Sequence, residues 1–206
     1  MSAALSALIV VGGVRAAEQA ATNIDVMQHL TAQVIGELYG KFSPTLAGRP
    51  VQLRPGGSTE DYAFVTNVFR EELARAGVTM VDTSARADSA QALVLQFQNV
   101  VFDLKYVDAH KSHVIGGKRV DRRAAVRMVT TLTDPSNGRV VWVGEAERSQ
   151  SDDIDYSDAA RIEQGAYKFN QPVVPSAGWG KYAEPVFVTG IIVGLIYLFF
   201  SNQSNN

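Results

Sequence analysis

The chain has 206 residues, of which 46% are hydrophobic, enough to bury the core of one domain with extensions. Its 19 basic and 21 acidic residues give a formal net charge of −2, which argues against a nucleic-acid-binding protein, because such proteins usually carry a strongly basic face. It contains no cysteine, which excludes disulfides, a thiolate nucleophile, a cysteine metal site and an anchor on a lipidated cysteine.

The first residues predict a signal peptide over residues 1–16. The apolar run over residues 3–14 is 12 residues long, which is too short to cross a bilayer and is typical of the apolar region of a secretory signal. Val14 and Ala16 stand where the −3 and −1 positions of a cleavage site belong. Because no Lys or Arg precedes the run, a cytosolic protein anchored by its C-terminal tail stays open as the alternative.

An amphipathic helix is predicted over residues 22–42. Apolar side chains recur there at spacings of three and four positions, which is the period of one helix face. Gly40 and Pro44 are expected to end the helix, because glycine and proline both weaken the helical backbone.

A folded α+β domain is predicted to follow over residues 45–156. A glycine-containing turn and a capping sequence precede its helix, and Gly77 stands where a left-handed helix cap belongs. The expected elements of this first half are a short strand over residues 51–53, a helix over residues 61–76 and a second short strand over residues 78–81.

The second half of the domain is predicted to be β-structure. Residues 103–122 are expected to form a loop or a ribbon, and the Asn137-Gly138 pair is a strong signal for a β-hairpin turn. The fold class is therefore α+β, with a small mixed or antiparallel sheet and two helices. The strands are expected over residues 92–102, 125–133 and 139–147.

After the domain, a linker is predicted over residues 157–184 and a single transmembrane helix over residues 185–200. The helix segment has 16 residues and no charge, and it would reach about 24 Å, slightly less than a hydrocarbon core of about 30 Å. The alternative is a buried core helix. Gly190 and Gly194, one turn apart, are expected to let a second helix approach closely, either from another copy or from a partner.

One basic cluster is a candidate contact for a partner protein or for anionic lipid headgroups. It comprises Lys118, Arg119, Arg122 and Arg123. The alternative is that these residues alternate along a strand and simply point toward water.

No catalytic, cofactor or metal site is predicted. His110 and His113 lie near Asp108 in sequence, but the segment reads as a loop that contains Lys111, so it is expected to be solvated. The acidic stretch over residues 152–158 lacks the glycine and the closing glutamate of a calcium loop. The glycine pairs carry no phosphate-loop Lys-Ser/Thr.

Residues 45–156 resemble the domain of the curli secretion channel and its relatives, which is similar to the amino-terminal domain of TolB. The resemblance is carried by residues 92–98 (Ala-Leu-Val-Leu-Gln-Phe-Gln), by a glycine-containing excursion over residues 113–118, and by the strand–turn–strand sequence over residues 125–142. The opening over residues 27–80 also resembles a lipoprotein of conjugative transfer systems. Family members usually carry an N-terminal lipidated cysteine, which this chain lacks, and the excursion is too short for membrane-spanning hairpins.

These observations predict a non-enzymatic, membrane-anchored structural or assembly component of a bacterial cell-envelope complex, with its domain outside the cytoplasm. The complex is expected to be of the secretion, conjugation or appendage type. The alternatives are a regulator that binds a peptidoglycan synthase and, less favoured, a hydrolase. The expected partners are other envelope proteins, membrane lipids and a second copy through the terminal helix, with no nucleic acid and no cofactor.

Overall fold

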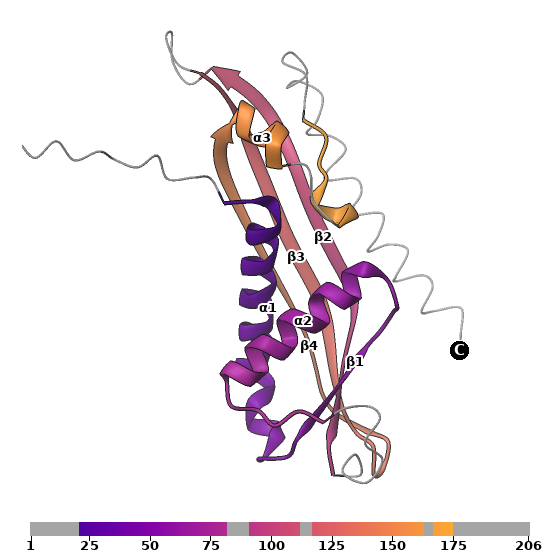
Figure 1. The fold of residues 1–206 in the computed structure, drawn as a ribbon. Helices are drawn as coiled ribbons and strands as arrows, with labels where there is room; N and C mark the ends of the chain where they lie inside the picture. The colour runs from indigo at the N-terminus through magenta and orange to yellow at the C-terminus, as the bar shows by residue number, and fades with distance from the viewer. Residues whose placement is uncertain (1–20, 82–90, 112–116, 163–166, 175–206) are drawn as a thin grey trace, which may run out of the picture.

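The computed structural model describes residues 21–81, 91–111, 117–162 and 167–174. Two helices and one short strand precede three long strands, and two short helical segments follow them (Figure 1). In chain order the elements are α1 (Asn23–Leu46), β1 (Val51–Pro55), α2 (Glu60–Arg75), β2 (Leu93–Lys111), β3 (Lys118–Asp134), β4 (Arg139–Asp155), α3 (Tyr156–Ile162) and the 3-10 helix η1 (Lys168–Asn170).

The four strands form one mixed sheet in the order β1-β2-β3-β4. β1 runs parallel to β2, whereas β2, β3 and β4 pair antiparallel. Gly138 takes a φ of 69° in the turn between β3 and β4, a left-handed conformation that favours glycine. The predicted hairpin turn at Asn137-Gly138 and the mixed α/β architecture are thus confirmed, with three α-helices where two were predicted.

The three long strands extend further than the sequence indicated. Of the two predicted alternatives for residues 103–122, a loop or a ribbon, the ribbon is observed over most of the range. β2 continues to Lys111 and β3 begins at Lys118. The predicted strand over residues 78–81 is reduced to a single bridge between Met80 and Val51.

Local signals set the helix ends. At the start of α1, the Thr22 N–H donates to Asp25 Oδ2 at 3.0 Å and the Asp25 N–H donates to Thr22 Oγ1 at 3.2 Å, which makes a capping box. α1 continues past Pro44, because a proline in the last turn removes only one backbone bond, and it ends where Ala47 takes a φ of 48°. Gly77, with a φ of 74°, caps α2 as predicted.

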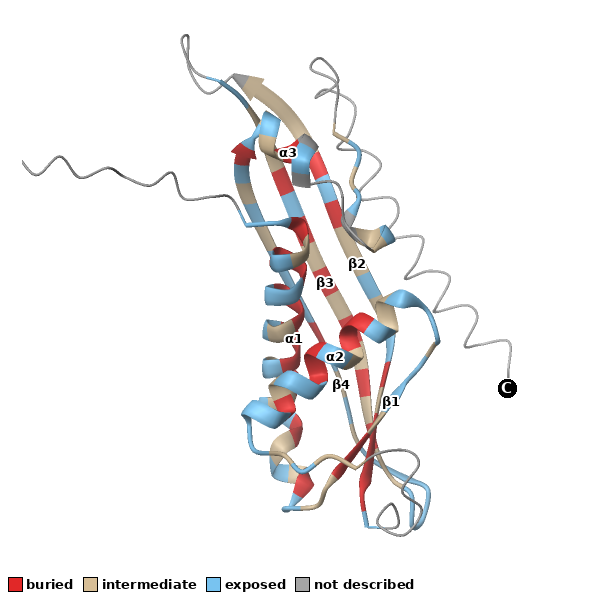
Figure 2. Ribbon diagram, in the orientation of Figure 1, coloured by how far each residue is buried: buried red, intermediate tan, exposed pale blue. Residues whose placement is uncertain are grey.

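The core lies between the helices and one face of the sheet (Figure 2). Even-numbered residues of β3 from Val120 to Leu132 are buried and odd-numbered ones are not, as expected when alternate side chains point to opposite faces. Phe97 stacks between Phe69 and Tyr62, with ring centroids 5.0 Å and 5.9 Å away. Most of the buried apolar side chains of the sheet and of both long helices form one large cluster, and a smaller cluster lies around Tyr106, Val120 and Ile154.

Two ion pairs tie the helical layer to the sheet. Arg148 of β4 binds Glu37 of α1 at 2.6 Å, and Arg49 binds Asp134 at 2.7 Å. The Arg49 guanidinium, helped by Ser136, holds the pKa of Asp134 well below its usual range. The pKa of Glu37 is lowered by its hydrogen bond to Lys41 and by Arg148.

The chain after β4 returns to the helical face of the sheet, so part of the predicted linker belongs to the folded body. Phe169 stacks on Phe102 with a centroid distance of 4.2 Å, and both Phe169 and Tyr167 contact Phe64. Val174 packs against a small cluster built around Tyr106. Tyr106 also hydrogen-bonds to Asn23 at the start of α1, so Ala21 and Val174 lie at the same end of the sheet.

Within the described part of the chain, no helix is both long enough and apolar enough to cross a membrane. The predicted signal peptide over residues 1–16 and the predicted transmembrane helix over residues 185–200, with Gly190 and Gly194, lie outside the described residues.

Candidate functional site

One face of the sheet carries no described element. α1, α2 and α3 all lie on the opposite face, where the buried side chains are (Figures 1 and 2). Odd-numbered residues of β3 point to the uncovered face and are exposed or half-buried. The described structure therefore presents a broad sheet surface that is available for contact.

Strand alternation divides the predicted basic cluster between the two faces. Arg119 and Arg123 belong to the uncovered face, and Lys118 lies at the strand start with its Nζ 5.3 Å from the centre of the Tyr156 ring. Arg122 points to the opposite face and is fully buried. The predicted contact patch is therefore corrected at Arg122, which no partner or headgroup can reach in this structure.

Arg122 instead ties the start of α1 to the sheet. Its Nε donates to Asp152 Oδ1 at 2.8 Å, and its Nη2 binds the other oxygen of the same carboxylate. Its Nη1 donates to the Ala21 carbonyl at 2.8 Å and to Asn23 Oδ1 at 3.0 Å. A buried guanidinium requires such partners, because an uncompensated buried charge is strongly unfavourable. The role of Arg122 is thus structural.

The uncovered face is charged toward the end of the sheet where Ala21 and Val174 lie. Asp121 of β3 stands directly opposite Asp108 of β2 on one side and Asp153 of β4 on the other. Arg119 binds the side chain of Asp153 and donates to Asp155 Oδ1 at 3.1 Å. Three carboxylates therefore occupy one row across the sheet.

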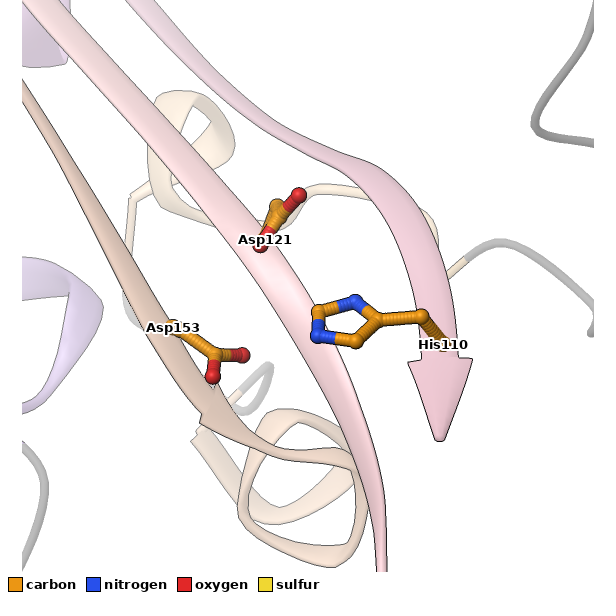
Figure 3. A group of neighbouring side chains, drawn as sticks. All are labelled: His110, Asp121 and Asp153. Atoms are coloured by element: carbon orange, nitrogen blue, oxygen red, sulfur yellow. The ribbon is translucent and has the colours of Figure 1, made fainter. Parts of the chain in front are cut away.

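Two carboxylates of this row, Asp121 and Asp153, lie close to His110, and the three side chains come from three adjacent strands (Figure 3). One potential ligand atom from each side chain lies within 4.8 Å of the other two. His110 and Asp121 are half-buried and Asp153 is exposed. Sequence reasoning considered His110 and Asp153 in separate local clusters and missed Asp121, because only the pairing register brings the three together.

At the hairpin end of the uncovered face, β4 exposes aliphatic side chains. Val140 and Val143 of β4 are 57% and 59% exposed, and Val141 lies between them in sequence. β4 is also the last strand of the sheet, and its outer edge pairs with no strand among the described residues. This stretch of an edge strand combines free backbone groups with exposed aliphatic side chains.

An open cleft of about 200 Å³ lies between α1 and α2. The carboxylate among its described lining residues, that of Glu72, is held by Arg75 in an ion pair. Among the described residues that line the cleft there is no histidine, and the only hydroxyl is the phenol of Tyr39. The lining residues are Gly36, Tyr39, Glu72, Leu73, Arg75 and Ala76.

Comparison with known protein families gives no match, and comparison with curated proteins gives none. Among solved structures, the chain is similar to a minor lipoprotein from Acinetobacter baumannii, with a TM-score of 0.37 and 12% identity over 54% of this chain and 69% of that one. It is also similar to a neuraminyllactose-binding hemagglutinin homolog from Helicobacter pylori, with a TM-score of 0.36 and 13% identity over 56% of this chain and 77% of that one. At this level of likeness neither protein carries an argument about function.

Proposed function

We propose that this chain is a non-enzymatic, membrane-anchored assembly component of a bacterial cell-envelope complex of the secretion, conjugation or appendage type. It binds a partner protein at the hairpin end of β4, through the strand edge and the exposed valines. The observation that carries this proposal is the edge strand itself, which has 17 residues and an outer side that no described strand covers.

An uncovered strand edge is a ready template for pairing with a strand of another protein. Natural proteins usually protect such edges with charged residues, and β4 does so over residues 145–155, which include four glutamates or aspartates on the uncovered face alone. Residues 140–143 read Val-Val-Trp-Val and carry no charge. The unprotected part of the edge is therefore the part suited to a partner strand with aliphatic side chains.

The envelope location rests on the sequence. The apolar run over residues 3–14 and the uncharged segment over residues 185–200 support secretion and anchoring, and the resemblance of residues 45–156 to envelope proteins supports the same compartment. Alkaline phosphatase fused just before Pro185 tests the topology. An active fusion is expected, whereas an inactive fusion with an active cytosolic reporter at the same point would establish the tail-anchored alternative.

Site-specific photocrosslinking tests the binding surface in cells that express the full chain. A photoreactive residue at Val143 is expected to give one discrete adduct with an envelope protein, and the same residue at Gln28, exposed on α1, is the control and is expected to give none. Replacing Val140 with Lys should abolish the Val143 adduct while leaving the fold intact, because the Val140 side chain is exposed.

The identity of the adduct decides between the functions. A subunit of a multi-protein envelope particle supports the assembly role. A single peptidoglycan synthase would instead establish the regulator. Equal adducts from Val143 and Gln28, or a Val143 adduct that survives Val140→Lys, would refute binding at the hairpin end.

Gly190 and Gly194 are proposed to face a neighbouring helix inside the membrane, because small residues let two backbones approach closely in lipid. Replacing both with Leu should leave membrane insertion intact and abolish crosslinking through residues 185–200. If the double variant crosslinks as the wild type does, the two glycines do not contact a partner helix and the segment serves only as an anchor.

A further inference from the structure

We propose that His110, Asp121 and Asp153 bind one divalent transition-metal ion of the Zn²⁺ type on the uncovered face of the sheet. The site lies at the opposite end of β4 from the valines, so the proposal is independent of the proposed function. It uses one imidazole nitrogen and two carboxylate oxygens from three neighbouring strands (Figure 3).

The geometry is close to what such an ion requires. With metal–ligand bonds of about 2.1 Å, the ligand atoms of a tetrahedral site lie about 3.4 Å apart. The three candidate atoms already lie within 4.8 Å of one another. Side-chain rotations that move each atom by about 1 Å would therefore complete the site. The fourth position stays open toward solvent, because no described element covers this face.

The charge distribution around the site favours a bound cation. Asp121 stands directly opposite Asp108 and Asp153, and like charges in directly opposite positions destabilise a sheet. Arg119 is the cation that the structure places against these acids, and it is shared between Asp153 and Asp155. In the described part of the chain, Asp121 makes no ion pair with a basic side chain. Two arginines of the same face, Arg119 and Arg123, flank Asp121 along β3, so the four carboxylates outnumber the guanidinium groups beside them.

Arg119 can keep its contacts with Asp153 while a metal ion is bound. It binds Oδ2 of Asp153 and also donates to the backbone carbonyl of the same residue. A carboxylate has two oxygens, so Asp153 can keep Oδ2 on Arg119 and turn Oδ1 toward the ion. Hydrogen bonds of this kind commonly orient the carboxylates that bind metals.

The donor set selects the class of metal. Ca²⁺ and Mg²⁺ prefer oxygen ligands alone, and Ca²⁺ takes six or more of them. Imidazole nitrogen suits zinc and its neighbours in the first transition series. We therefore expect Zn²⁺ to bind this site far more tightly than Mg²⁺ or Ca²⁺.

Calorimetric titration of the chelator-treated full chain with ZnCl₂ tests the proposal. One ion should bind per chain, and MgCl₂ and CaCl₂ at the same concentrations should give no saturable heat. His110→Gln and Asp121→Asn should each weaken zinc binding at least tenfold. The matched controls His29→Gln, at an exposed histidine of α1, and Asp103→Asn, at a carboxylate paired with Lys105 on the same face, should leave binding unchanged.

A thermal melt supplies a second readout that does not depend on the heat of binding. At the same concentration, zinc should raise the Tm of the wild type more than the Tm of Asp121→Asn. The metal-free variant should be at least as stable as the metal-free wild type because a like charge is removed. Absence of saturable zinc binding would overturn the proposal. The proposal would also be overturned if His110→Gln weakened zinc binding and Asp121→Asn did not, because the ion would then not be bound by residues of all three strands.

Discussion

Replacing Asp152 with Asn should destabilise the fold far more than the same change at Asp153, its neighbour in sequence. Asp152 points to the helical face and neutralises Arg122, whose side chain is 0% exposed. Breaking a buried ion pair by removing one partner costs about 3–5 kcal/mol. The Asp152 side chain is 31% exposed, so solvent screens part of the interaction. The expected loss in the free energy of unfolding is therefore at the lower end, about 3 kcal/mol.

The control variant removes a carboxylate of the same type from the uncovered face. Asp153 is exposed, and Arg119 keeps Asp155 as a partner after Asp153→Asn, so a loss of about 0–1 kcal/mol is expected. Urea unfolding of the full chain in chelating buffer, followed by circular dichroism, measures both values. For a chain of this size the Asp152 variant should also melt about 6–12 °C lower. Equal losses from the two variants would refute the assignment of Arg122 as a buried charge that depends on Asp152.

Three further predictions concern single side chains. Because Arg49 lowers the pKa of Asp134 in the folded state, the ionised carboxylate of Asp134 stabilises the fold above about pH 4. The Tm difference between the wild type and Asp134→Asn should therefore shrink as the pH is lowered from 4 to 2, and a constant difference would contradict this. Thr22→Ala should cost about 0.5–2 kcal/mol in urea unfolding by removing the α1 cap, whereas Thr59→Ala, at a helix start without a side-chain cap, should cost less. Phe97→Ala should lower the free energy of unfolding by about 3–5 kcal/mol, and a loss below 1 kcal/mol would contradict its place in the core.

Local features of this fold could be predicted from the sequence because each depends on a few adjacent residues. The Asn137-Gly138 turn is one such feature, since a left-handed glycine fixes the hairpin geometry by itself. The end of α2 at Gly77 is another. The end predicted for α1 from Pro44 was wrong, because the effect of a proline depends on how much helix follows it.

Features that join distant parts of the chain could not be predicted in the same way. The stacking of Phe169 on Phe102 depends on the path of the chain after β4, which no periodic pattern specifies. The burial of Arg122 had a detectable signal, because it is in phase with the apolar residues at even positions of β3. Its charge nevertheless predicted exposure, and only the partner on β4 explains why the guanidinium can be buried.

Both ends of the described chain lie at one end of the sheet, so the length of the strands sets the distance from these ends to the hairpin turn. Arg122 holds Ala21 there, and Val174 lies against the neighbouring Tyr106 cluster. β3 ends at Asp134 beside the hairpin turn, 12 residues beyond Arg122, or about 40 Å away at the rise of a β-strand. If the chain beyond Val174 is tied to a bilayer, the sheet acts as a rigid arm that carries Val140 and Val143 well past the lipid headgroups. A partner would then be contacted at the end of the sheet far from the chain ends, and removing two residues from each of β3 and β4 would shorten that distance by about 7 Å.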